Sequence, residues 1–165
     1  MWTLKQVLRI TPNFGKVIKS IDGDVKVRSL EKQGEYEEAR KIRKNLLGKH
    51  QVKHMGPLWR SEGMDQLYKL KNYEKSLEAF ENAITCIEGK SYISAMQYGI
   101  TQPLEVYYGA AAAAICVSDD VRAEIYYHKF CELVSRLGYN EHYQNQLQWL
   151  KAQIDALNPQ GGNIN

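Results

Sequence analysis

Apolar residues recur every three or four positions along most of the chain, which is the spacing of one face of an α-helix. The clearest stretch covers residues 73–88, where Leu77, Phe80, Ala83 and Ile84 fall on one side. No segment alternates apolar and polar residues in the manner that predicts a β-strand. The pattern therefore predicts an all-α protein of about seven or eight helices joined by short loops.

Proline, glycine and capping residues divide this pattern into helices. Pro57 and Pro103 are expected to begin two of them, and Asn140 is expected to cap the last. Asp22-Gly23 is either a turn or a weak position within a longer helix. From residue 36 onward the expected helices cover 36–47, 57–70, 73–88, 103–117, 121–137 and a final stretch after 140. Residues 90–103 are the least periodic internal segment.

Two of these segments are similar to each other, with Tyr36 aligning with Tyr73 at an offset of 37 residues. The chain resembles the tetratricopeptide repeat family over about residues 20–137, although that family has a period of about 34 residues and its Trp-x2-Leu-Gly-x2-Tyr signature is poorly kept here. The matching positions are Tyr73, Ser76, Phe80 and Ala83 in the best copy, Tyr36 and Ala39 in the first, and Tyr107, Ala110, Ala111, Ala123, Tyr127 and Phe130 in a weaker third.

The resemblance implies a right-handed stack of antiparallel helical hairpins whose first helices line a concave groove. Carried over from the best copy, the groove wall comprises Leu58, Ser61, Asp65, Tyr68 and Lys69. The weaker copies add Asp24, Arg28, Lys32, Glu105 and Tyr108. The set lacks the Lys/Asn cluster with which family members hold a terminal carboxylate, so we do not expect that type of ligand. A generic helical bundle is the alternative, because the same spacings suit any helix core.

Length and composition are ordinary for one compact domain. The chain has 165 residues, 44% hydrophobic and 25% charged. We expect a single helical-repeat domain over 1–158 and a flexible tail over 159–165. No apolar run approaches the roughly 20 residues that span a bilayer, and residues 1–5 lack the plan of a signal peptide. A cytoplasmic protein without membrane contact is expected, with Cys86, Cys116 and Cys131 as buried free thiols.

Charge is unevenly distributed along the chain. Residues 1–60 contain 14 Lys and Arg against 6 Asp and Glu, and residues 61–165 contain 8 against 13. A basic stretch without acids lies between Ala39 and Arg60, and its proposed patch residues are Arg40, Arg43, Lys44, Lys49 and Lys53. We expect a solvated helix face there, with binding to the phosphates of a nucleic acid as the functional alternative. Head-to-tail contact between the basic and acidic halves of two copies is a further possibility.

Motifs for catalysis and cofactor binding are absent from the sequence. There is no Gly-x-Ser-x-Gly elbow, no phosphate-binding glycine loop and no Cys/His pairing of recognisable spacing. His50 and His54 could share a helix side, but no third metal ligand accompanies them. We therefore expect no enzymatic activity, no cofactor and no metal. The sequence favours a protein-interaction module or adaptor that binds a peptide or protein in the groove, and the alternative is a nucleic-acid-binding protein that uses residues 39–60.

Overall fold

The protein is all-α over the part that the structure describes. The computed structural model describes residues 14–49, 56–89 and 102–158, with the backbone alone at 14–21, 24 and 49. Within these ranges no helix combines the length and the apolarity needed to cross a bilayer. The elements are α2 (Phe14–Lys32), α3 (Tyr36–Lys49), α4 (Gly56–Met64), the π-helical turn η2 (Asp65–Leu70), α5 (Tyr73–Glu88), α7 (Gln102–Cys116), α8 (Asp120–Leu137) and α9 (Gln144–Leu157).

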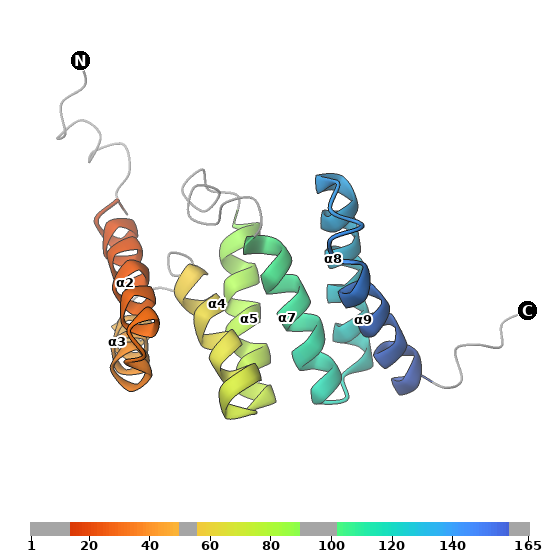
Figure 1. The fold of residues 1–165 in the computed structure, drawn as a ribbon, viewed down its shortest axis with the longest axis horizontal. Helices are drawn as coiled ribbons and strands as arrows, with labels where there is room; N and C mark the ends of the chain where they lie inside the picture. Colours follow the sequence, from red (N-terminus) through yellow and green to blue (C-terminus); the bar gives the residue numbers. More distant parts are fainter. Residues whose placement is uncertain (1–13, 50–55, 90–101, 159–165) are drawn as a thin grey trace, which may run out of the picture.

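Neighbouring helices in the sequence are neighbours in space, and they form two layers (Figure 1). Helices α2, α4, α7 and α9 lie in the nearer layer of Figure 1, and α3, α5 and α8 lie behind them. Contacts within the nearer layer join α2 to α4, α4 to α7 and α7 to α9. One face of the molecule is therefore made of every second helix along the described chain.

Most helix ends agree with their sequence signals. Asn72 caps α5 by accepting a hydrogen bond from the Lys75 amide at 3.3 Å. Asp119 caps α8 in the same way, accepting from the Arg122 amide at 2.9 Å. Gly138 ends α8 in the left-handed conformation, with φ of 73°.

Two expected boundaries differ from the structure, and one open question is answered by it. Asn140 does not cap the last helix, because residues 140–143 form turns and α9 begins at Gln144. The expected helix 57–70 is an α-helix only to Met64 and then widens into η2. The Asp22-Gly23 question is resolved in favour of a continuous helix, since both residues lie inside α2. A Cβ at position 23 would collide with the Leu46 side chain, so the glycine permits the close approach of α3.

The main hydrophobic core lies between α5, α7 and α8. The ring of Phe80 is fully buried between two glycines, Gly63 of α4 and Gly109 of α7. A Cβ at position 63 would lie 2.9 Å from the ring, and one at position 109 would lie closer still. The Ser76 hydroxyl donates to the Gly63 carbonyl at 2.9 Å and ties α5 to α4. Small residues on three helices therefore allow one aromatic ring to join α4, α5 and α7.

A second, smaller cluster lies at the N-terminal end of the molecule. Its buried members are Val27, Ala39 and Leu58, with Leu30, Ile42, Leu46, Leu47 and Trp59 packed against them. Trp59 also packs against the main core and so joins the two clusters. The expected single domain over 1–158 stays a prediction, and the expected tail over 159–165 lies outside the described residues.

Candidate functional site

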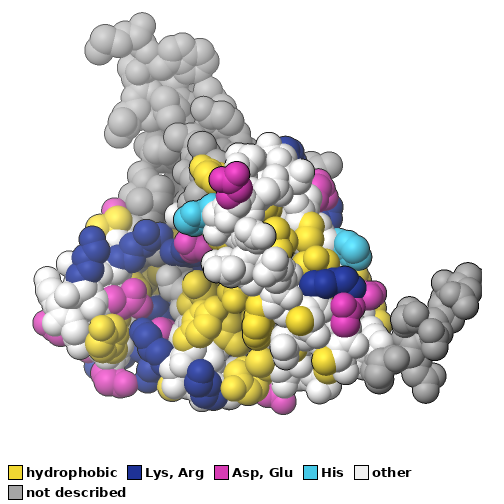
Figure 2. All heavy atoms as spheres, turned by 45° about the vertical axis from the view of Figure 1, so that its right-hand side comes forward, with side chains coloured by type: hydrophobic (Ala, Val, Ile, Leu, Met, Phe, Trp, Pro, Cys, Tyr) yellow, Lys and Arg dark blue, Asp and Glu magenta, His cyan; other side chains and the backbone are white. Residues whose placement is uncertain are grey.

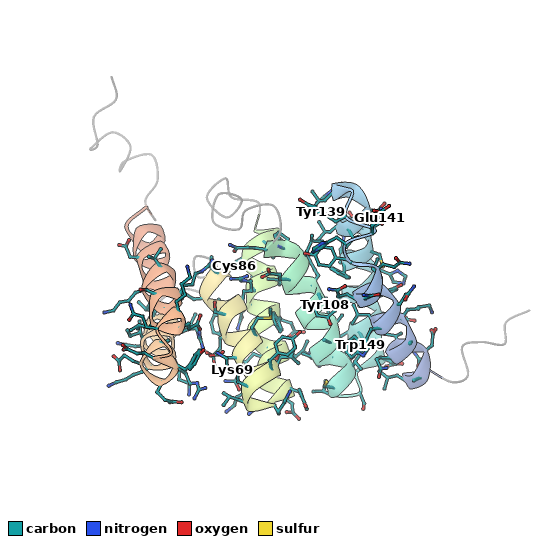
Figure 3. The ribbon with its side chains drawn as sticks, viewed as in Figure 1. Lys69, Cys86, Tyr108, Tyr139, Glu141 and Trp149 are labelled. Atoms are coloured by element: carbon teal, nitrogen blue, oxygen red, sulfur yellow. The ribbon has the colours of Figure 1, made fainter. Side chains whose placement is uncertain are left out.

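Three aromatic side chains on three helices of the nearer layer form a row. Tyr68 lies on η2, Tyr108 on α7 and Trp149 on α9. The Tyr68 and Tyr108 side chains are close enough to influence each other's acidity, and the ring centroids of Tyr108 and Trp149 are 6.4 Å apart. Figure 3 shows Tyr108 and Trp149 on the adjoining α7 and α9. We call Tyr68, Tyr108 and Trp149 the aromatic row.

The middle of the aromatic row packs on the buried core, and both of its ends are exposed to solvent. Tyr108 packs on the buried ring of Phe130, with centroids 5.7 Å apart. Tyr68 and Trp149 are 48% and 42% exposed. Figure 2 shows apolar side chains gathered in the middle of one face, with Lys and Arg side chains toward the N-terminal helices. Aromatic side chains held in place by such packing present contact area that loses little conformational entropy on binding.

Burial and hydrogen bonding alter the acidity of this surface. Burial, followed by the influence of Tyr108 and Cys116, raises the pKa of Tyr68 to about 12. Burial also raises the pKa of Tyr108, although the nearby Tyr68 hydroxyl acts to lower it. For Cys116, desolvation raises the pKa of the thiol and outweighs the opposite effect of Lys71. All three groups are therefore neutral near pH 7.

Alkaline titration tests the Tyr68–Tyr108 contact. Tyr68 is expected to ionise near pH 12 rather than near the ordinary value of about 10. Because its folded-state pKa is raised, its contribution to stability is intact below about pH 10 and is lost as the pH rises through about 12. Ultraviolet absorbance of the phenolate should show that Tyr68→Phe removes amplitude from the late phase. Tyr108→Phe should shift the ionisation of Tyr68 to lower pH. If Tyr68→Phe instead removed amplitude from the phase near pH 10, the assignment would be contradicted.

The residues expected to line a groove have different surroundings in the structure. Ser61, Tyr68 and Lys69 lie on α4–η2 and Tyr108 on α7, all at least partly exposed. Lys32 is exposed on α2, and Arg28 is half-buried there. Leu58 is wrong as a groove residue because it is fully buried in the small N-terminal cluster. Asp65 is also buried, at 6% exposure, and its carboxylate is engaged in ion pairs.

The most concentrated charge in the described residues surrounds Arg43. Its guanidinium donates to Glu62 at 2.9 Å, to Glu31 at 3.0 Å and to Asp65. Arg43 is itself fully buried. Burial acts to lower the pKa of Arg43, but the carboxylates of Asp65 and Glu62 and the hydrogen bond to Glu31 raise it above its ordinary value. We call Arg43 with these three carboxylates the Arg43 cluster.

This geometry corrects the expected basic patch. Arg43 does not face a ligand, because its side chain is enclosed by acids from three other elements. Arg40 pairs with Glu37 at 2.9 Å, and Arg60 pairs with Glu105 of α7. Lys44 is exposed as expected. The Lys49 side chain and Lys53 lie outside the described residues.

The sequence did not point to Trp149 or to the acidic partners of Arg43, and the predicted burial of the cysteines was only partly correct. Trp149 was not assigned a role, although a tryptophan that lies beside the apolar face of a helix, and not within it, is a usable signal. Glu31 and Glu62 were missed because they lie 12 and 19 residues from Arg43, too far for helical pairing rules. Among the cysteines Cys86 is buried as expected, but Cys131 is only partly buried and Cys116 is exposed.

Comparison with known proteins gives no assignment. No protein-family model, no curated protein and no solved structure matches this chain.

Proposed function

We propose that the protein is a non-catalytic interaction module that binds a peptide or protein segment across the layer of α2, α4–η2, α7 and α9. The observation that supports this proposal most directly is the aromatic row, in which three side chains from successive helices of one layer form a partly exposed surface. Aromatic anchors of this kind commonly dominate the binding energy of protein interfaces. In this proposal the module acts as a cytoplasmic adaptor.

We further propose that the helices form a right-handed stack of hairpins like that of tetratricopeptide repeats. Contacts from α2 to α4, α4 to α7 and α7 to α9 support it, since the inner helices of such a stack approach one another most closely. Phe80 supports it as well, because its ring packs against Gly63 in its own hairpin and Gly109 in the next. In this proposal the π-helical turn between Trp59 and Tyr73 holds one residue more than the family's repeat, which would explain why the Trp-x2-Leu-Gly-x2-Tyr signature is poorly kept here.

Binding to nucleic acid is the weaker proposal. This proposal relied on cations without partners between residues 39 and 60. In the structure, however, Arg40, Arg43 and Arg60 each pair with a carboxylate, which leaves fewer cations for phosphates. Steep loss of binding with rising salt would distinguish nucleic acid from a peptide in the groove.

A pair of matched double variants tests the groove. Tyr68→Ala with Trp149→Ala removes both exposed ends of the aromatic row. Val121→Ala with Ile125→Ala removes two exposed apolar side chains from α8, in the other layer. Proteins captured from lysate of the source organism are identified, and the affinity of the segment they share is measured by calorimetry.

The first pair should weaken binding by about 30-fold or more, the effect of losing an interface anchor. The second pair should leave it unchanged. Equal losses from both pairs, with folding intact, would contradict the groove as the binding surface.

A further inference from the structure

The N-terminal pair of helices, α2 and α3, meets the rest of the described protein through a small apolar contact. Across this junction the buried cluster has one fully buried residue from α4, Leu58, with Trp59 partly buried beside it. The main core holds α5, α7 and α8 together with many more buried side chains. Hydrophobic stabilisation follows the apolar area removed from water. The N-terminal pair therefore gains much less from apolar docking than the other helices gain from one another.

Charged side chains also cross this junction. Arg43 of α3 crosses it to reach Glu62 of α4 and Asp65 of η2. Lys69 also crosses it, since its ammonium lies 4.6 Å from the centre of the Tyr36 ring of α3. Lys69 lies on the side of η2 that faces α2 and α3 (Figure 3). The same Lys69 pairs with Asp65 at 2.7 Å, so the two crossing contacts share a carboxylate.

A buried ion pair differs from apolar packing in its energetics. The cost of removing the charges from water offsets most of their attraction, so an intact pair adds little net stability. Removing one partner, in contrast, leaves an unpaired charge and is strongly destabilising. A junction built around Arg43 is thus weak when intact and sensitive to the loss of one group.

We propose that α2 and α3 form a latch, which undocks as a unit from α4–η2 while α5, α7, α8 and α9 remain folded. Arg43 acts as its release point, because this one guanidinium joins α3 directly to both the Glu62 and the Asp65 carboxylates. Undocking exposes Leu58 and frees both carboxylates on α4–η2. It also removes Lys32 of α2 from the layer that contains the aromatic row, so that the latch sets the length of the exposed face.

Native-state hydrogen exchange of the full chain tests the latch. Amides of α3 are expected to exchange through a partial opening of the protein. The free energy of this opening should fall less steeply with denaturant than the free energy of the opening that exposes the α7 and α8 amides. In Arg43→Met the α3 amides should exchange about a hundredfold faster or more, as expected for a buried pair that has lost one partner. Exchange in α7 and α8 should stay within a few-fold of the wild type.

Arg40→Met provides the matched control. Arg40 lies on the same helix, but its partner Glu37 is 86% exposed and belongs to α3 itself. This variant should leave the α3 exchange rates nearly unchanged. The latch would be refuted if wild-type α3, α7 and α8 amides exchanged through one common opening with the same denaturant dependence. Because that comparison uses the wild type, it decides the question even if Arg43→Met does not fold.

Discussion

Replacing Phe80 by alanine is expected to lower the free energy of unfolding by about 3–5 kcal/mol, the usual cost of deleting a buried aromatic side chain. The ring is fully buried and contacts both α4 and α7 through Gly63 and Gly109. Its removal would leave a cavity at the point where three helices meet. Urea unfolding followed by circular dichroism measures the effect.

Gly109→Ala supplies the control for this prediction. Alanine in place of glycine within a helix ordinarily gains about 1 kcal/mol. Here the new Cβ would meet the Phe80 ring, and overpacking costs about 1–3 kcal/mol, so a net loss of up to about 2 kcal/mol is expected. In the Phe80→Ala background the same change should become stabilising, because the collision is gone. An identical effect in both backgrounds would show that ring and glycine do not interact.

Arg43→Ala is the second change with a large expected effect. It should destabilise the docking of α2 and α3 by about 3–5 kcal/mol, because Glu62 remains buried without its cation and Asp65 keeps only its ion pair with Lys69. The truncation also leaves a space that matches a small guanidinium compound, with three carboxylates at hydrogen-bonding positions. Millimolar ethylguanidinium is therefore expected to restore part of the lost stability.

The rescue must show chemical selectivity to support this interpretation. Ethylammonium has the same charge but not the planar fork that donates to several carboxylates at once, and it should restore much less. Unfolding is measured in urea, since guanidinium chloride would itself occupy the site. Arg40→Ala should show no rescue, because its partner is on the surface. Equal rescue by both compounds would indicate ionic strength rather than a guanidinium site.

How far the sequence predicts this structure depends on whether the relevant interactions are local. The helix over Tyr73–Glu88 was predicted with its correct ends, because the residues of its apolar face lie within a few positions of one another. The caps that Asn72 and Asp119 form in the structure are local in the same way, since each side chain accepts from an amide three residues later. Asn140 shows the limit of such signals, since tertiary packing of Tyr143 on Phe130 accompanies a later helix start.

The candidate site was predicted less well because its interactions are distant in sequence. Tyr68 and Tyr108 were assigned to one groove wall through the family resemblance, which stays a prediction, and their side chains influence each other's acidity in the structure. Arg43 was placed on the surface because a charged residue without local partners is normally solvated. Its three acidic partners come from α2, α4 and η2, and only the folded chain assembles them.

The π-helical turn has a consequence for how the aromatic surface can be altered. An α-helix advances by about 100° per residue, so a turn in which the backbone widens changes the direction in which its side chains point. Residues 65–70 form such a turn and include Tyr68. Deleting one residue between Asp65 and Tyr68 is expected to return the segment to an α-helix and to turn the tyrosine away from its partner on α7. The orientation of Tyr68 therefore depends on the widened backbone of this turn.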